Sequence, residues 1–223
     1  MLDATTLASM SRRLYAGQHW RWRFAQSLRP FICPFGEVLD LVPPRARVLD
    51  VGCGSGMFLL FLASLRRIES GRGFDIALDA VVAARQAAGA TPEPGLLTFE
   101  QRAIEAGIPQ GDWTVVSAID VIHHVSPTRQ ASFVRALCDA APPGSRLIVK
   151  DMVVTPRWRA FANRLHDLLM ARQWVHHVDP ASVETWVTDA GLRCVHRSHA
   201  NLFWYGHWTL VFERPGAVAT AKG

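Results

Sequence analysis

The chain has 223 residues and a mass of 24.7 kDa; 49% of its residues are hydrophobic and 19% are charged. A chain of this length can bury the core of one domain, and its composition excludes both a disordered chain and a small disulfide scaffold. The formal net charge of +5 is mild. The sequence shows no clustered basic stripe of the kind that is typical of nucleic-acid binding, so we do not expect nucleic acid as a partner. The positive charge would suit an acidic substrate or an acidic carrier protein.

The cysteines indicate a reducing compartment. They lie far apart and form no C-x-x-C pair: Cys33, Cys53, Cys138 and Cys194. Free thiols in the cytoplasm are the simplest interpretation. The N-terminus has no signal-peptide core, and the longest apolar run, residues 57–65, is too short to span a bilayer. We therefore expect a cytoplasmic protein without a transmembrane segment.

Residues 1–44 are predicted to form a helical cap ahead of the main domain, interrupted by prolines. Aromatic residues alternate with arginines in this segment, among them Tyr15, Trp20, Trp22 and Phe24. We expect these four side chains to form a lid over a substrate. Packing against the sheet edge is an alternative, and so is contact with a membrane surface or a nucleic acid.

Residues 47–63 are typical of a buried strand, a glycine-rich turn and an apolar helix. The turn follows Asp50 and contains Gly52, Gly54 and Gly56. Glycines permit backbone angles and close approaches that a side chain would block. The helix that follows points its free N–H groups and positive dipole end back at the turn. Such a turn can hold a ligand against bare backbone.

The glycine spacing separates two classes of ligand. The dinucleotide fingerprint is G-x-G-x-x-G, whereas this turn is D-x-G-x-G-x-G, with Met57 in place of the third glycine. The acid at the strand end suits a ligand with a cationic end better than a pyrophosphate. Residues 48–56 resemble the first motif of class I S-adenosylmethionine-dependent methyltransferases, V-L-D-x-G-C-G-x-G. A nucleotide-cofactor oxidoreductase would fit the strand, turn and helix but not this spacing.

A second carboxylate, Asp75, ends the next predicted strand, residues 71–76. It lies where nucleotide-binding folds place a ribose-binding acid, and its two oxygens can accept both ribose hydroxyl protons. The alternative role is the N-cap of the predicted helix 77–88. In the resembled family an acid after the third strand, here residues 96–100, meets the adenine amine. Residues 102–104 hold no acid at that place, which leaves Glu100, Glu105 or backbone groups as a substitute.

The fourth predicted strand, residues 113–120, leads into V-I-H-H-V, which resembles the family's stretch ending in V-x-H-H-V. Ligands bind outside the carboxyl ends of parallel strands, so Asp120, His123 and His124 should share a rim with the glycine turn. A histidine there can take a proton near neutral pH. We expect these three residues to be catalytic, with one histidine as the base. The alternative is that the histidines orient the loop.

The rest of the chain continues the pattern. A helix is predicted at 128–141, and residues 142–151 resemble the family's L-x-P-G-G-x-L-x-I-x-D turn and fifth strand. Helices at 157–172 and 180–190 and strands at 191–195 and 207–212 follow. The resemblance covers residues 45–213 and implies a Rossmann-like α/β domain. Its seven-stranded sheet would be mostly parallel, with an antiparallel last strand and helices on both faces. We expect residues 214–223 to form a flexible tail.

The resemblance also implies S-adenosylmethionine as the cofactor. The glycine turn would pack against its methionyl and ribose portions, Asp50 would act on the methionyl ammonium directly or through water, and Asp75 would bind the ribose. Asp120 and its neighbours would border the methyl group. The cofactor-binding residues that we expect are Asp50, Gly52, Cys53, Gly54, Ser55, Gly56, Asp75, Ile76, Ala118, Ile119 and Asp120.

The acceptor is expected to be a small molecule, with O-methylation of an aromatic, lipid or polyketide-type intermediate. A weaker resemblance, carried by C-P-F at 33–35 and P-R-W at 156–158, is to small bacterial methyltransferases of pigment, lipid and polyketide pathways. It raises an acidic acyl carrier protein as a partner. C- or N-methylation of a small molecule or an RNA stays open, as does a non-catalytic binding module.

No metal is expected. Asp120 and Asp151 occupy places where some catechol-type relatives of the family hold magnesium, and carboxylate oxygens suit that ion. Met152 stands where those enzymes have an asparagine, and His176 and His177 have no cysteines at zinc spacing.

Overall fold

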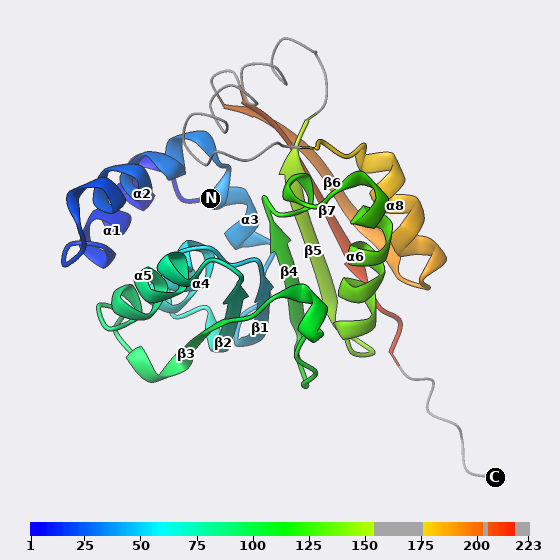
Figure 1. Ribbon diagram of the computed structural model, residues 1–223, viewed down its shortest axis with the longest axis horizontal. Coiled ribbons are helices and arrows are strands. Elements are labelled where there is room, and N and C mark those ends of the chain that lie inside the picture. Colours follow the sequence, from blue (N-terminus) through cyan, green and yellow to red (C-terminus); the bar gives the residue numbers. More distant parts are fainter. Residues whose placement is uncertain (154–175, 203–204, 217–223) are drawn as a thin grey trace.

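A computed structural model describes residues 1–153, 176–202 and 205–216. Its centre is a seven-stranded sheet in the order β3-β2-β1-β4-β5-β7-β6 (Figure 1). The strands are β1 (Ala46–Val51), β2 (Ile68–Asp75), β3 (Leu97–Gln101), β4 (Val115–Ile119), β5 (Arg146–Met152), β6 (Arg193–Leu202) and β7 (Tyr205–Glu213).

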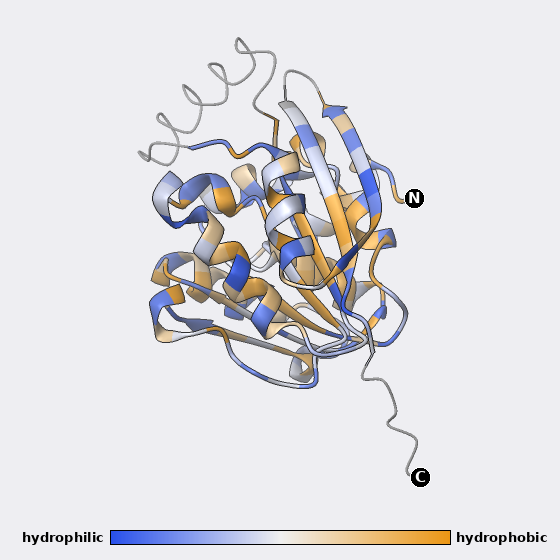
Figure 2. Ribbon diagram, turned by 90° about the vertical axis from the view of Figure 1, so that its right-hand side faces the viewer, coloured by the Kyte–Doolittle hydropathy of each residue, from blue (hydrophilic) through white to orange (hydrophobic). Residues whose placement is uncertain are grey.

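The sheet is parallel except for β7, which pairs antiparallel with both β5 and β6. The prediction of a mostly parallel sheet with an antiparallel last strand is therefore confirmed. The central strands β1, β4 and β5 are buried almost throughout, as continuous apolar runs covered on both faces require. Figure 2 shows these middle strands largely in the orange of hydrophobic residues.

Helices cover both faces of the sheet, as predicted. One face packs against α4 (Met57–Ser64) and α5 (Leu78–Ala88), and the other packs against α6 (Pro127–Ala140) and α8 (Pro180–Asp189). Alternate residues of β1 join opposite cores, with Val48 on the side of α4 and Leu49 on the side of α6. Burial of both cores holds the carboxyl ends of β1, β2 and β4 at one edge of the sheet.

Three helices precede β1: α1 (Ala4–Leu14), α2 (Trp20–Ile32) and α3 (Phe35–Asp40). Asp3 caps α1 by accepting a hydrogen bond from the backbone N–H of Thr6 at 2.8 Å. Leu7, Leu14 and Phe35 join the core on the side of α4. The N-terminal helices therefore pack onto the sheet domain, and α2 lies at the outer edge of this group (Figure 1).

Some predicted features lie outside the described residues. These are the helix at 157–172, the P-R-W segment at 156–158, the aromatic residues 203 and 204 of the last turn, and most of the tail at 214–223. Within the described part of the chain, no helix has both the length and the apolar character needed to cross a membrane. All four cysteines are free thiols.

Candidate functional site

A cavity of about 710 Å³ opens at the carboxyl ends of β1, β2 and β4. Seven of the predicted site residues line it: Gly52, Gly54, Asp75, Ile76, Ile119, Asp120 and His124. The helix and loop that follow β4 add Val121, Val125, Arg129 and Phe133, and α2 adds Arg29. The sequence therefore placed the glycine turn, Asp75 and the end of β4 on one rim, which is where the cavity lies.

The glycine turn is held open toward this cavity. Gly54 has φ +54°, and a Cβ added there would meet no atom within 4 Å, so its backbone faces free space. Gly56 has φ +80°, and a Cβ added there would lie 2.7 Å from the ring of Phe99. A side chain at either position would strain the backbone, and one at Gly56 would also push the turn away from the sheet.

Asp75 is fixed by two backbone donors. Its Oδ2 accepts from the N–H of Gly54 at 2.8 Å, and its Oδ1 accepts from the N–H of Ala77 at 2.9 Å. These bonds fix the carboxylate between the glycine turn and the start of α5. Each oxygen keeps further acceptor capacity toward the cavity. Asp75 is not the N-cap of α5, because Ala77 holds that position and α5 has no side-chain cap hydrogen bond.

Asp50 is buried and does not line the cavity. Its Oδ1 accepts from the hydroxyl of Ser117 on β4 at 2.7 Å. Burial raises the pKa of Asp50 to about 7, and the Ser117 hydrogen bond only partly offsets this. The resemblance implied a contact of Asp50 with the ligand either directly or through water. Because the buried carboxyl group lies outside the cavity lining, the contact through water is the one that this arrangement accommodates.

Asp120 borders the cavity and is surrounded by cations from distant parts of the chain. The Nζ of Lys150 on β5, itself fully buried, lies 2.6 Å from Asp120 Oδ1, and a guanidinium nitrogen of Arg29 lies 3.8 Å from Oδ2. Burial would raise the pKa of Asp120, but Lys150 and then His207 and Arg29 outweigh it, so the pKa lies below its usual range. The residue adopts φ +57°, an uncommon backbone angle for a residue with a side chain.

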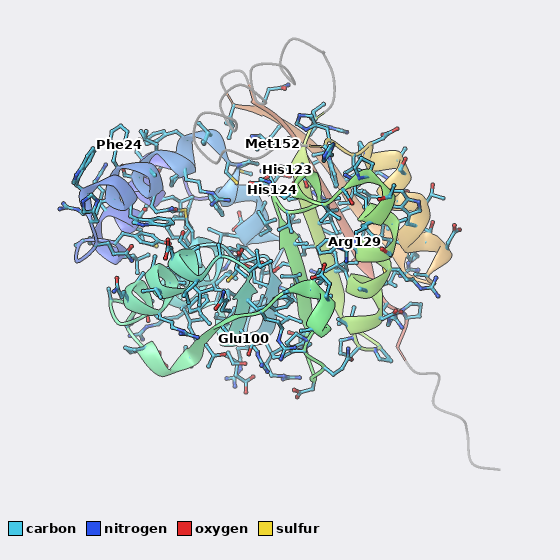
Figure 3. All side chains as sticks on the ribbon, viewed as in Figure 1. Phe24, Glu100, His123, His124, Arg129 and Met152 are labelled. Atoms are coloured by element: carbon cyan, nitrogen blue, oxygen red, sulfur yellow. The ribbon has the colours of Figure 1, made fainter. Side chains whose placement is uncertain are left out.

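The two predicted histidines have different surroundings. His123 is buried; its Nδ1 lies 2.5 Å from Asp151 Oδ1, and its backbone N–H donates to Oδ2 of the same carboxylate at 3.1 Å. His124 is exposed, lines the cavity, and has its ring 4.1 Å from that of His123. Figure 3 shows both near the upper ends of β4 and β5. Only His124 therefore has access to a ligand in the cavity.

Gln130 on α6 supports this histidine loop, the 3-10 helix η3 (Ile122–His124). Its side-chain amide donates to the carbonyl oxygens of Val125 and His176, at 3.3 and 2.7 Å. The backbone N–H of His176 donates to the carbonyl oxygen of His123 at 2.7 Å. These bonds fix the position of His124 without engaging its ring.

Four predicted cofactor residues lie behind the surface that a ligand would touch. Cys53, Ser55 and Gly56 form the back of the turn, and Ala118 is fully buried in β4. Tyr15 joins them: it is fully buried, and its hydroxyl donates to the carbonyl oxygen of Ser55 at 2.9 Å. Tyr15 is thus a support of the glycine turn, which differs from the expectation of a substrate lid.

The other expected lid residues also lie outside the cavity lining. Trp20 and Phe24 are 66% and 62% exposed, and Trp22 faces a separate groove beside α5. Figure 3 shows Phe24 on the outer side of the N-terminal helices. The reason is the register of α2, which turns Trp20 and Phe24 outward and only Arg29, in its last turn, toward the cavity. The expectation of an aromatic cover is corrected accordingly.

The expected adenine region holds a surface ion pair. Glu105 lines the cavity and lies 2.6 Å from a guanidinium nitrogen of Arg129. Glu100 does not line it, because its two oxygens bind Arg72 and Arg102 at 3.0 and 2.8 Å. Of the two candidate substitutes, Glu105 therefore has the position for an adenine contact.

The sequence-based prediction did not assign three residues that hold site side chains in place. These are Arg29 and Lys150, which contact Asp120, and Asp151, which contacts His123. A lysine inside the apolar run of β5 was a signal that could have been used, since a buried ammonium requires a carboxylate partner. Within the described residues, no group of histidine, cysteine or acidic side chains is arranged to hold a metal ion. Asp120 and Asp151 are engaged instead by Lys150 and His123.

Comparison with known families gives a match over most of the chain. The family model described as a methyltransferase domain matches residues 12–197. That range includes the glycine turn, Asp75, Asp120 and the histidine loop, and it reaches back into the N-terminal helices.

Among curated relatives, the ubiquinone biosynthesis O-methyltransferase of Xanthomonas axonopodis pv. citri is 28% identical over 163 residues, which cover 69% of this chain and 65% of that protein. The indolepyruvate C-methyltransferase of Streptomyces griseus is 27% identical over 129 residues, covering 52% of this chain and 36% of that protein. This chain thus spans at most about two thirds of the length of these relatives.

A solved structure with a similar fold is magnesium protoporphyrin IX methyltransferase from Synechocystis PCC 6803 with bound S-adenosylhomocysteine. It superposes with a TM-score of 0.68 at 20% identity and covers 95% of both chains. At this identity the likeness concerns the fold, and it includes the region of the N-terminal helices.

Proposed function

The chain belongs to the methyltransferase domain family, and from this premise we propose that it transfers a methyl group from S-adenosylmethionine to a small-molecule acceptor. The observation that carries the proposal is one continuous cavity that joins the glycine turn and Asp75 to His124. A donor and an acceptor bound in the same cavity can be aligned at about 3–3.5 Å with water excluded, which is the main requirement of this displacement.

The residues present fit the cofactor. The open space over Gly54 accommodates a ligand against the backbone, and Asp75 presents acceptor oxygens to a ribose diol. Ile76, which is 70% exposed on the cavity wall, offers an apolar surface for the adenine ring. Glu105 lies at the same end for the adenine amine. When bound, S-adenosylmethionine would supply a methyl group already activated by a positive sulfur.

The methionyl end is assigned to Asp120 and Arg29. The ammonium and the carboxylate of an α-amino acid can pair with Asp120 and Arg29, whose charged atoms lie 3.8 Å from each other. Asp120 stays ionised because of Lys150, so it can accept from the ammonium. Arg29 can pair with the carboxylate. Asp50 would support the turn from behind through Ser117.

The acceptor is proposed to lose a proton to His124. An imidazole at the cavity surface can act as a base near neutral pH if the nucleophile is a phenol or an alcohol. His123 and Asp151 would hold the loop rather than meet the acceptor, since His123 is buried. O-methylation of an aromatic, lipid or polyketide-type intermediate is the reaction that we favour, and the ubiquinone O-methyltransferase relative supports it.

C-methylation is the second candidate, because one relative is an indolepyruvate C-methyltransferase. An acceptor bound to an acidic acyl carrier protein is the third case that the experiment below distinguishes. Incubation with free phenolic, enolic and carrier-bound acceptors, followed by mass spectrometry and NMR of the product, separates the three cases. The methyl carbon shift distinguishes an oxygen-bound from a carbon-bound methyl group.

Replacement of His124 tests the assignment of the base. His124→Gln should lower kcat by about 10²–10⁴-fold with little change in the Kd for S-adenosylhomocysteine. His199→Gln, an exposed histidine on β6, is the matched control and should retain full kcat. Unchanged kcat in His124→Gln would remove this residue from the chemistry and favour an acceptor that needs no base. Failure of the wild type to bind S-adenosylhomocysteine would overturn the methyltransferase proposal itself.

A further inference from the structure

The positive charge of the chain is concentrated in its N-terminal helices, which differs from the dispersed charge expected from composition. Residues 4–36 contain five arginines and no acidic residue. The chain has 24 lysines and arginines and 19 acidic residues, so outside this segment 19 basic residues face 19 acidic ones. The whole net charge of +5 therefore arises in α1, α2 and the start of α3. This part of the molecule would be drawn to an anionic surface.

The same segment exposes an apolar stripe on α2. Trp20, Phe24 and Leu28 follow one another at intervals of four residues, which places them on one side of the helix. They are 66%, 62% and 44% exposed. A surface helix ordinarily turns such residues toward the core. The stripe is therefore an exposed apolar surface on one helix face, and contiguous exposed apolar patches mark interaction sites.

The inner side of α2 is the more polar one. Gln26 is buried, and its side-chain oxygen has no hydrogen-bond partner in the described part of the chain. Its backbone carbonyl accepts from the hydroxyl of Ser11 on α1 at 2.8 Å. Helix α2 thus places three large apolar side chains outward, while its buried side includes the polar Gln26. A helix with apolar residues outward and arginines beside them has the composition of an interfacial helix.

Apolar surface continues from α2 toward the cavity. A groove of about 450 Å³ lies between the start of α2 and α5, lined by Trp22, Leu78 and Val82. Leu78 and Val82 are themselves exposed, and Ile76, just before α5, lies on the wall of the main cavity. Arg29, in the last turn of α2, lines that cavity as well. Trp22 and Arg29 lie on the side of α2 opposite the stripe, so α2 contacts the groove and the cavity with one side and exposes the stripe on the other.

We propose that α2 docks on the surface of an anionic lipid bilayer. Trp20, Phe24 and Leu28 insert among the headgroups, while Arg12, Arg13 and Arg23, all exposed, lie beside the anionic phosphates. A planar apolar layer suits a stripe that runs along the helix, and the aromatic rings suit the boundary between headgroups and acyl chains. The docking itself does not depend on the chemistry proposed above.

Vesicle binding by the full chain, without cofactor or acceptor, tests this proposal. Vesicles of phosphatidylglycerol and phosphatidylcholine in equal parts should sediment the wild type, and pure phosphatidylcholine vesicles should sediment much less. Trp20→Ala combined with Phe24→Ala should reduce the partition coefficient by at least about tenfold, because two inserted rings are lost. Arg12→Gln combined with Arg13→Gln should reduce it by about tenfold. NaCl at about 1 M should weaken binding by the wild type.

Matched controls keep the test specific. Val195→Ser removes an exposed apolar side chain on β6, and Arg135→Gln with Arg193→Gln removes two exposed charges far from α2; both should bind vesicles like the wild type. Circular dichroism and melting temperature establish that each variant is folded. Equal vesicle binding by the Trp20/Phe24 variant and the wild type would overturn the proposal. So would sedimentation-velocity data showing that the stripe instead joins two copies, or vesicle-free capture of an acidic carrier protein through the same residues.

Discussion

The cavity has two carboxylates, Asp75 and Asp120, and the protein holds them in opposite ways. Asp75 takes its hydrogen bonds from the backbone N–H groups of Gly54 and Ala77, which belong to the glycine turn and to the residues just after the acid. Asp120 is held by side-chain cations, Lys150 from β5 and Arg29 from α2, which lie far away in the chain. One end of the cavity is organised by local backbone, and the other by long-range ion pairs.

The two arrangements suit different parts of a ligand. Neutral backbone donors leave the charge of Asp75 available to hydroxyl groups, as a ribose requires. At Asp120 the charge is already balanced, and Arg29 stands beside it with its own charge only loosely engaged at 3.8 Å. A pair of opposite charges complements a zwitterion rather than a simple anion or cation. Each of the following substitutions changes one side of this comparison.

Removing the buried cation should have the largest effect. Lys150→Met leaves Asp120 buried without its closest partner, and breaking a buried pair in this way costs about 3–5 kcal/mol of unfolding free energy. Urea unfolding monitored by circular dichroism measures the loss. Lys150→Met combined with Asp120→Asn should recover much of the stability, since no uncompensated charge remains. A loss below about 1 kcal/mol in the single variant would show that Arg29 alone can balance Asp120.

Removing the acid at the backbone-organised end should affect ligand binding more than folding. Asp75→Ala should weaken S-adenosylhomocysteine binding by about 10–100-fold, because hydrogen bonds to a charged acceptor contribute about 1.5–3 kcal/mol. Isothermal titration calorimetry gives the Kd. Asp79→Ala, an acid in the first turn of α5 that lines the separate groove, is the matched control and should bind normally. Equal affinities of the two variants would exclude Asp75 from the ribose site.

Replacement of Asp50, behind the glycine turn, is expected to change the unfolding free energy less than Lys150→Met does, and to raise it rather than lower it. The pKa of Asp50 is about 7 in the folded protein, above the ordinary value near 4 of an aspartate in an unfolded chain. The folded state therefore holds a proton that the unfolded state has lost, so the stability that this group contributes below pH 4 disappears as pH rises through 7. Asp50→Asn keeps an acceptor for Ser117 and removes the cost of burying a charge.

The ligand-free Asp50→Asn variant should accordingly be more stable than the wild type by about 1–2 kcal/mol at pH 8. For a chain of this size that is a rise in melting temperature of roughly 2–8 °C. The difference should shrink as pH falls toward 4, where both proteins carry a neutral group. Thermal melts in buffers from pH 4 to 8 measure it. A difference that is constant over this range would mean that Asp50 does not titrate in it.

Sequence-based prediction succeeded where the backbone itself makes the site. The run from β1 through the glycine turn to α4 can be recognised because its strand, glycines and helix are adjacent in the chain. Asp75 could be predicted as a site residue, since its spacing from the turn is fixed by one helix and one strand. The parallel sheet with an antiparallel last strand was implied by the resemblance to the family. The placement of β7 between β5 and β6 is an addition from the structure.

The sequence by itself determined the family, through its motifs, and the glycine turn and the edge of the sheet where the cavity opens, because local spacing fixes these features. Tertiary structure alone decided which of two adjacent histidines faces the cavity, and that Tyr15 supports the turn while Trp20 and Phe24 point outward. It also brought Arg29 and Lys150 to Asp120. These outcomes depend on helix register and on contacts between distant residues, which no local pattern encodes.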